Sequence, residues 1–116
     1  MCGERNNYIH YVNTWWWGKS ITLIRKGGYS KVELAFDDDM PNTVTIRGLM
    51  VFTTRRRSGI GAEMMKCCED IAREQKMRFL QLSANKDQSW LVDWYTRLGF
   101  VTIMKDEHEY TMIKKL

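Results

Sequence analysis

The chain has 116 residues, of which 44% are hydrophobic and 28% charged, and its formal net charge is +4. This length and composition predict one globular domain over residues 1–116 and exclude a disordered chain, while so small a positive charge suits a small anionic ligand better than a long nucleic acid. No apolar run approaches the roughly 20 residues that a membrane-spanning helix needs, and the N-terminus lacks the apolar core of a signal peptide.

The N-terminal segment is rich in aromatic side chains, namely Tyr8, Tyr11 and Trp15–Trp17. Such residues are favoured in apolar pockets and at interfaces, and we predict an edge strand that packs on the core. Because successive side chains of a strand point to opposite faces, three consecutive tryptophans cannot all face inward. We therefore expect at least one of them to contact a ligand, a partner or the second helix, and a homodimer through this segment is one arrangement that provides such a contact.

Two strand-like segments follow at residues 21–24 and 32–36, each made largely of apolar and β-branched residues. Gly27 and Gly28 lie between them and are typical of a turn, so we predict an antiparallel hairpin. The polar residues 37–42, which include the only proline of the chain, are interpreted as the next connection.

A third strand is predicted from about Thr43 to Phe52. Val44 and Ile46 fall on even positions before Gly48, whereas Leu49 and Val51 fall on odd positions after it. One extra residue reverses the faces of a strand, and glycine is a common occupant of such a position. The sequence therefore predicts a β-bulge at Gly48.

This strand leads into a basic turn that contains Arg55–Arg57, Ser58, Gly59 and Gly61. Glycine lets the backbone approach a ligand closely, and the first amides of a helix have no partner within the helix. The helix dipole and the arginines add positive potential, so the segment predicts a phosphate or pyrophosphate site. The alternative is an ordinary glycine turn with a solvated run of charge.

From Ile60 to Ala72 the apolar residues recur with the period of a helix, and charged residues occupy the other positions. Cys67 and Cys68 fall on the apolar face, so we interpret them as core residues and not as nucleophiles. Together with Cys2 they form no C-x-x-C pair, which fits a reducing cytoplasm.

The remaining segments complete the sheet. Residues 79–82 form the next predicted strand, and the order strand, helix, strand implies a parallel pair. A second helix is predicted over Ser89–Arg97, with Asp87 or Ser89 as its N-cap. Residues 100–104 and 110–113 are predicted to form a closing hairpin.

Two motifs of the chain occur together in the order and spacing of a known superfamily. The first is Arg56-x-x-Gly59-x-Gly61, which begins five residues after Val51, and the second is Tyr95-x-x-x-Gly99-Phe100. With this pair the sequence resembles the GNAT N-acetyltransferase superfamily over about residues 21–116. Either motif alone is weak evidence, whereas both on the expected elements are much stronger.

The resemblance implies an α+β fold with a mixed sheet: antiparallel N-terminal strands, a splayed parallel strand pair with two helices, and a C-terminal hairpin. The strand that ends at Val51 and the strand at residues 79–82 would splay apart. The superfamily usually places a strand and two helices before the central hairpin, whereas only about 20 residues precede Ile21. A shortened N-terminal helical region is expected, with an acceptor side that is abbreviated, open or completed by another subunit.

The resemblance also implies acetyl-CoA as co-substrate and no metal ion. The pyrophosphate would be held by amides at the helix start, and the pantetheine would enter between the splayed strands, where backbone amides polarise the thioester carbonyl. The residues expected to bind the carrier are Leu49, Met50, Val51, Arg56, Arg57, Ser58, Gly59, Ile60, Gly61 and Ala62. Asn85 and Gln88 are expected either to bind the pantetheine amides or to cap the second helix.

Tyr95 is the expected catalytic acid, because a phenol with a pKa of about 10 can protonate the departing thiolate. Outside this motif it would be interpreted as a core aromatic residue. Glu33 is the expected base, acting through water, and Asp37–Asp39 and His108 are further candidates. All of these acidic and imidazole groups also fit solvated surface positions, and deprotonation by water alone is a further alternative.

The residues and the resemblance together predict a cytoplasmic N-acetyltransferase that moves an acetyl group to a primary amine, of a small molecule or a peptide, by direct attack on the thioester. A degenerate member that binds acyl-CoA or serves as an interaction module is the first alternative, favoured by the short N-terminus and the lack of a dedicated base. A basic nucleic-acid-binding domain that uses Arg55–Arg57 and the tryptophans is the second, and the motif at Tyr95 argues against it.

Overall fold

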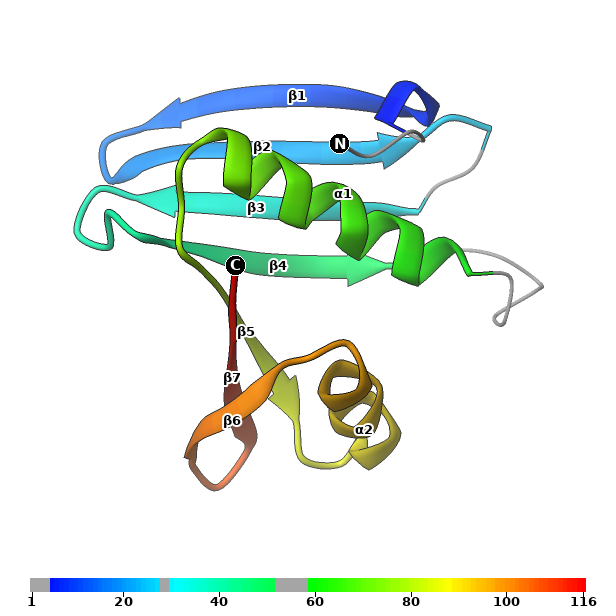
Figure 1. Cartoon of the computed structure of the whole chain (residues 1–116), viewed down its shortest axis with the longest axis vertical. Coiled ribbons are helices and arrows are strands. Elements are labelled where there is room, and N and C mark those ends of the chain that lie inside the picture. The colour runs from blue at the N-terminus through cyan, green and yellow to red at the C-terminus, as the bar shows by residue number, and fades with distance from the viewer. Residues whose placement is uncertain (1–4, 28–29, 52–58) are drawn as a thin grey trace.

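The computed structural model describes residues 5–27, 30–51 and 59–116. Within them the elements are a 3-10 turn at Arg5–Asn7, β1 (Tyr8–Trp15), β2 (Gly18–Arg25), β3 (Lys31–Asp37), β4 (Thr43–Met50), α1 (Ile60–Glu74), β5 (Phe79–Asn85), α2 (Ser89–Arg97), β6 (Val101–Lys105) and β7 (Glu109–Lys115). The strands form one mixed sheet in the order β1-β2-β3-β4-β5-β7-β6 (Figure 1). The predicted α+β class, with antiparallel strands first and a hairpin last, is confirmed.

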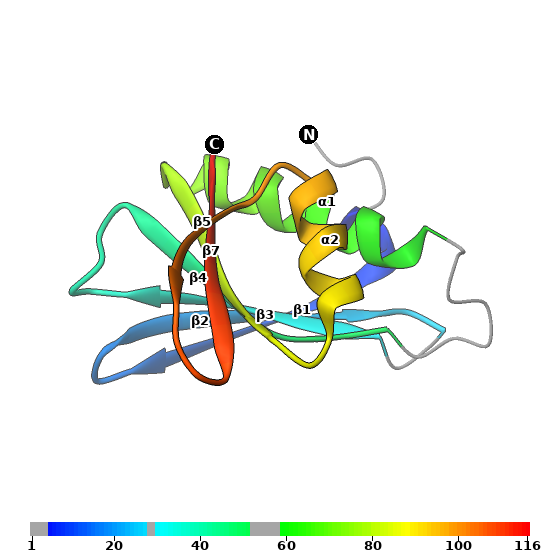
Figure 2. The same ribbon diagram turned by 90° about the horizontal axis from the view of Figure 1, so that it is seen from below.

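Both helices lie on one face of the sheet (Figure 2). Alternation along β2 identifies this face, because Lys19 and Arg25 reach α1 through hydrogen bonds to Gln75 and Glu63. Odd-numbered residues of β2 therefore point to the helices and even-numbered residues point to the other face. No helix among the described residues covers that other face, which we call the open face.

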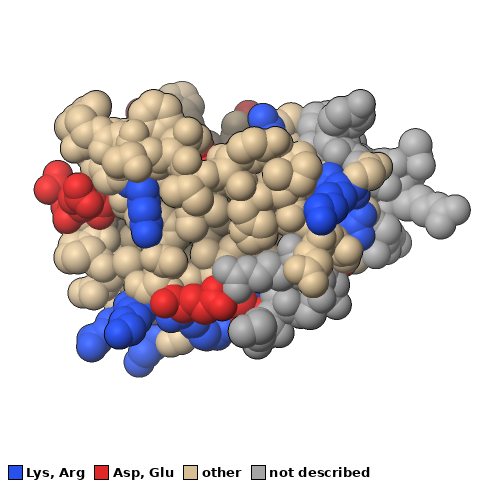
Figure 3. Space-filling model, turned by 90° about the horizontal axis from the view of Figure 1, so that it is seen from above, with Lys and Arg blue, Asp and Glu red and all other residues tan. Residues whose placement is uncertain are grey.

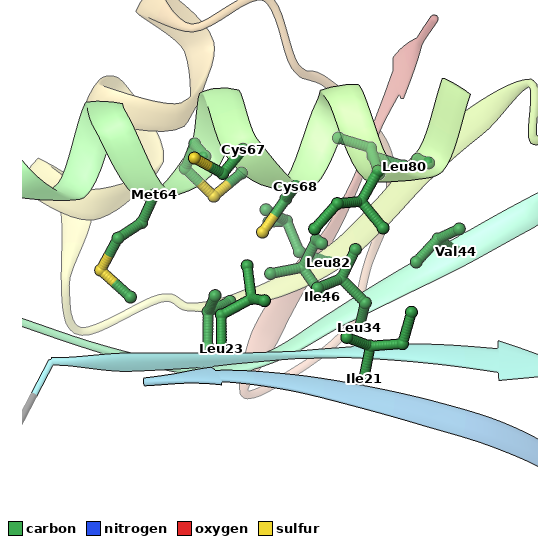
Figure 4. Close-up of a cluster of buried hydrophobic side chains, with 14 of the residues drawn as sticks. Ile21, Leu23, Leu34, Val44, Ile46, Met64, Cys67, Cys68, Leu80 and Leu82 are labelled. Atoms are coloured by element: carbon green, nitrogen blue, oxygen red, sulfur yellow. The ribbon is translucent and has the colours of Figure 1, made fainter. Parts of the chain in front are cut away.

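The core lies between the sheet and α1 (Figure 4). Leu23, Leu34 and Val44 of the sheet are fully buried, and so are Cys67 and Cys68 of the helix. Burial of a large apolar side chain contributes roughly 1.5–3 kcal/mol, so this layer holds the helix in place. The interpretation of the two cysteines as core residues is confirmed, and burial raises the pKa of the Cys68 thiol, which keeps it unreactive.

The predicted bulge in β4 is present. Glu33 pairs with Arg47 and Lys31 pairs with Met50, so two steps along β3 match three steps along β4. Gly48 supplies the extra residue in the left-handed region, with φ of 58°, which glycine adopts without steric penalty.

The parallel pair of β4 and β5 is short and then separates. Pairing runs only from Thr43 opposite Phe79 to Thr45 opposite Gln81, although both strands continue beyond these residues. Past this point β5 stays paired with β7 on its other side and turns away from β4 (Figure 1). The predicted splay between the two strands is therefore observed.

Several boundaries differ from the prediction. β5 continues to Asn85, past the predicted end at Leu82, because β7 pairs with it throughout. The N-cap position of α2 is Gln88, without a side-chain cap, and not Asp87 or Ser89. The amide of Asp87 is instead held by Asn85 Oδ1 at 2.9 Å in the preceding turn. β4 ends at Met50, and Phe52 lies outside the described residues.

Candidate functional site

The start of α1 presents free backbone amides at the carboxyl end of β4. The first intrahelical bond runs from the Glu63 amide to the Gly59 carbonyl at 3.0 Å, which leaves the amides of Ile60, Gly61 and Ala62 without intrahelical acceptors. Gly59 holds the N-cap position with φ of 82° and supplies no side-chain cap. Anions are favoured at such a helix start.

Part of the predicted phosphate turn lies outside the described residues. This part contains Arg55, Arg56, Arg57 and Ser58. The described part of the site is therefore the helix start itself and the end of β4.

The start of α1 packs closely on α2. A Cβ atom at Gly61 would lie 3.2 Å from Cζ2 of Trp94 and 3.6 Å from a methyl group of Val51. Trp94 was not singled out from the sequence, although it directly precedes Tyr95 in the second motif. The contact joins the helix start, the end of β4 and α2 into one cluster.

The edge of β4 that faces the gap has no strand partner after Thr45 among the described residues. This stretch contains the bulge at Gly48 and continues through Leu49, Met50 and Val51. Its backbone groups on that edge are available to a ligand that enters between β4 and β5. The gap and the free amides of α1 thus lie at the same end of β4.

Tyr95 is buried in α2 with 5% of its surface exposed. Its ring lies 5.1 Å from that of Trp94 and 5.7 Å from that of Phe100. Burial raises the pKa of Tyr95 to about 12, and the nearby Cys68 adds to the shift. The pKa is thus higher than the value of about 10 expected for a free phenol, so Tyr95 is protonated at neutral pH.

Glu33 lies on the open face and is paired with Arg47. Nε of Arg47 donates to Oε1 of Glu33 at 2.7 Å, and Nη2 lies 2.5 Å from the same oxygen. The Arg47 guanidinium also lies 5.4 Å from the centre of the Trp17 ring. Glu33 is adjacent to the bulge across the strand pair, whereas Asp37–Asp39 lie at the opposite end of β3 and His108 lies in the β6–β7 turn.

A shallow hollow of about 200 Å³ lies on the open face beside the bulge. Its lining residues are Thr22, Lys31, Val32, Glu33, Arg47 and Gly48, and we call it the β2–β4 hollow. A larger hollow of about 490 Å³ lies at the other end of the sheet, next to Thr43 and Met77. Only the smaller one adjoins the bulge.

Asn85 and Gln88 lie at the carboxyl end of β5, across the gap from β4. Asn85 Oδ1 accepts a bond from the Asp87 amide, and the Gln88 amide donates to the Asn85 carbonyl at 3.0 Å. Asn85 therefore shapes the turn before α2. The Gln88 side chain is exposed and does not cap the helix.

The described residues offer neither a metal-binding cluster nor a membrane-spanning helix. They contain no group of three or more His, Cys, Asp or Glu side chains arranged to hold a metal ion. None of their helices has the length and apolar character needed to cross a membrane.

Comparison with known proteins gives a family match. The acetyltransferase (GNAT) family matches residues 8–100, which is most of the chain. No curated protein sequence shows significant similarity.

Solved structures share the fold at low sequence identity. A GNAT family acetyltransferase from Elizabethkingia anophelis with acetyl-CoA bound is 12% identical with a TM-score of 0.72, over 96% of this chain and 99% of that one. The IAA acetyltransferase from Bacillus cereus is 15% identical with a TM-score of 0.72, over 84% and 78%. The PaiA N-acetyltransferase from Thermoplasma acidophilum in complex with coenzyme A is 17% identical with a TM-score of 0.71, over 84% and 60%.

Proposed function

This chain belongs to the acetyltransferase (GNAT) family, and we propose that it transfers an acetyl group from acetyl-CoA to a primary amine by direct attack. The observation that supports this most strongly is the position of three uncapped amides, those of Ile60, Gly61 and Ala62, beside the gap between β4 and β5. An anchor for a diphosphate and an opening for its acyl arm lie at one end of β4.

The carrier is held mainly by backbone groups in this proposal. Its pyrophosphate accepts hydrogen bonds from the start of α1, with Arg56, Arg57 and Ser58 of the preceding turn assisting. Asn85 and Gln88 line the β5 side of the gap and contact the pantetheine amides. Two of the similar structures contain acetyl-CoA or coenzyme A, which supports the same class of ligand here.

The amides of Leu49, Met50 and Val51 stabilise the developing oxyanion. The bulge at Gly48 turns this part of β4 out of its regular ladder with β3, and β5 does not pair with it. Donors that are already oriented and unpaired lose little energy in reorganisation when charge appears on the carbonyl oxygen.

The acid step belongs to Tyr95. The amine nitrogen attacks the thioester carbonyl, the carbon–sulfur bond breaks, and the departing sulfur takes the proton of the Tyr95 hydroxyl. Among the described residues no group is hydrogen-bonded to that hydroxyl, which leaves it available to the carrier. Its high pKa keeps the proton in place until the thiolate forms.

Glu33 receives the proton of the attacking amine through water. Both polar contacts of Arg47 with Glu33 are made to Oε1, so Oε2 is left to accept a further bond. Arg47 fixes the carboxylate in orientation beside the bulge. Since the pair is half exposed, it adds little to stability by itself.

The N-terminal segment supports one weaker element of the proposal, the homodimer. Trp16 is 93% exposed and β1 is the edge strand of the sheet, which supports self-association of two copies through this edge. Figure 3, which views the molecule from the β1 side, shows a broad central area without charged side chains. The cytoplasmic location and the dimer stay predictions, and light scattering of the purified chain tests the latter.

Calorimetry with acetyl-CoA tests the carrier site directly. Ala62 is exposed in the first turn of α1. The helix dipole stabilises an acidic side chain at this position, but such a side chain repels a diphosphate. We expect Ala62→Glu to fold normally and to bind acetyl-CoA at least tenfold more weakly, while Ala62→Gln, the neutral control of similar shape, binds within about threefold of the original chain. Equal affinity in the two variants would contradict the proposed anchor.

Thiol-release assays with a panel of amines separate an enzyme from a binding module. Tight binding of acetyl-CoA without turnover of any amine would favour the degenerate member of the family. Turnover that depends on Glu33 and Tyr95 would establish the enzyme.

A further inference from the structure

The open face is the side on which an acceptor can meet the acetyl group. The start of α1 lies on the helix-covered face, and β4 and β5 separate next to it (Figure 2). A carrier that is anchored at α1 and passes between the two strands delivers its thioester toward the opposite face. That face carries the β2–β4 hollow directly beside the bulge.

Four residues form one transverse row on the open face. Tyr11 pairs with Thr22, Thr22 with Glu33, and Glu33 with Arg47, each on the next strand of the sheet. Directly paired residues of neighbouring antiparallel strands project to the same side. The row therefore leads from Tyr11 at the β1 edge to the β2–β4 hollow, which Thr22, Glu33 and Arg47 line.

A stacked tryptophan pair lies next to Arg47 on the open face. The rings of Trp15 and Trp17 stack with centroids 6.3 Å apart and planes within 6°, and Nε1 of Trp15 donates to Oγ of Ser20 at 3.0 Å. Ser20 is fully buried on the open face although no described helix lies over it. The indoles therefore cover the neighbouring part of the sheet and form an apolar wall beside Arg47.

The charges of the hollow do not cancel. Arg47 is committed to Glu33, whereas Lys31 has no ion-pair partner among the described residues. Lys31 lies two positions from Glu33 on β3, so the two Cα atoms are about 7 Å apart on the same face. The hollow thus offers one carboxylate oxygen for an ammonium group and one unpaired cation close to it.

We propose that the β2–β4 hollow binds the acceptor and selects amines that also carry a carboxylate, as an amino acid does. This inference rests on the proposed acetyltransferase function. The amine lies at Glu33 beside the bulge, the carboxylate of the acceptor pairs with Lys31, and an aromatic side chain lies against Tyr11 and Trp17. A polyamine is disfavoured, because its second ammonium group would meet Lys31 and Arg47.

Phenylalanine and phenethylamine form the matched probes, because they differ only in the carboxylate, and spermidine represents polyamines. Initial rates of thiol release with saturating acetyl-CoA give kcat/KM for each. We expect kcat/KM for phenylalanine to exceed that for phenethylamine at least tenfold, the usual size of a charge-assisted contact. The difference from spermidine should be larger.

Lys31→Gln is expected to raise the KM for phenylalanine, so that kcat/KM for phenylalanine exceeds that for phenethylamine by no more than about threefold. Lys31→Arg keeps the positive charge and is expected to retain the full preference. Lys115→Gln, at an exposed position of β7, is the control and keeps the full preference. Unchanged thermal unfolding would show that Lys31→Gln is folded, and unchanged affinity in calorimetry would show that it still binds acetyl-CoA.

The outcomes separate the two levels of the proposal. Thiol release that is equal for phenylalanine and phenethylamine, or that favours spermidine, overturns the assignment of the acceptor and leaves the acetyltransferase intact. A preference for phenylalanine that persists in Lys31→Gln overturns the role of Lys31. Absence of thiol release with every amine overturns the proposed function itself, and the acceptor assignment with it.

Discussion

Trp94 of α2 packs directly on the backbone of Gly61 in the first turn of α1, at a distance that leaves barely enough room for a Cβ atom. The same glycine borders Val51 at the end of β4. One residue without a side chain therefore allows three segments to meet where free amides face the gap. The contact gives the second glycine of the first motif a packing role in addition to its backbone role.

Substitution at Gly61 is expected to depend on side-chain size. Gly61→Ala requires a shift of a few tenths of an ångström by Trp94, offset by the better helix propensity of alanine, so the free energy of unfolding should change by less than about 1 kcal/mol. Gly61→Val displaces the indole and should cost about 1–3 kcal/mol. Urea unfolding measures both, with Ala62→Val at the exposed neighbouring position as control. Equal stability of the two Gly61 variants would contradict tight packing.

Gly48 is expected to tolerate asparagine better than alanine. Its φ of 58° is left-handed, and a Cβ atom there meets no atom of the described residues within 4 Å apart from its chain neighbours, so the penalty arises from the backbone. Gly48→Ala should lower the free energy of unfolding by about 1 kcal/mol, and Gly48→Asn by less, since asparagine populates this region more readily. A larger loss in Gly48→Asn would contradict the bulge geometry.

The Tyr8 hydroxyl should stabilise the contact between the edge strand and α1. It is buried and donates to Oε1 of Glu63 at 2.7 Å, and a hydrogen bond to a charged group contributes about 1.5–3 kcal/mol. Tyr8→Phe should therefore lower the free energy of unfolding by a similar amount at pH 7. Tyr11→Phe, at a half-exposed position of the same strand, is the control and should be neutral.

The same hydroxyl should make stability depend on alkaline pH. Burial, and then Glu63, raise the pKa of Tyr8 in the folded chain. Above a pH of about 10 the unfolded chain loses this proton while the folded chain keeps it, so stability is lost as pH rises. The free energy of unfolding, measured between pH 8 and 11 to span the phenol pKa of about 10, should decline less steeply with pH in Tyr8→Phe than in the original chain. An identical slope would contradict the shift.

Local patterns predicted most of the fold. The parity change around Gly48 revealed the bulge because the residues on each side must keep facing one core, and the helical period from Ile60 gave α1 to within two residues of its observed end. Both signals are encoded within a few residues of the feature that they predict. The two motifs then placed Gly59, Gly61 and Tyr95 at one end of the molecule.

The features that the sequence did not predict depend on register between distant strands. Tyr11, Thr22, Glu33 and Arg47 are aligned only once three strand pairs are fixed. The close approach of Trp94 to Gly61 and the raised pKa of Tyr95 likewise arise from packing between elements. Burial, and not the residue type, sets these properties.

Tyr95→Phe should separate the chemical role of Tyr95 from its packing role. The phenyl ring keeps the contacts with Trp94 and Phe100, so thermal unfolding and acetyl-CoA affinity should be nearly unchanged. Loss of the proton donor should lower kcat about 10²-fold or more. Because the pKa of Tyr95 is raised to about 12 and an acid must be protonated to act, the original chain should show no alkaline loss of kcat from this group below a pH of about 11. Rates measured between neutral pH and this limit, with Tyr110→Phe as control, test both points. An unchanged kcat in Tyr95→Phe would remove Tyr95 as the acid and leave it a core residue.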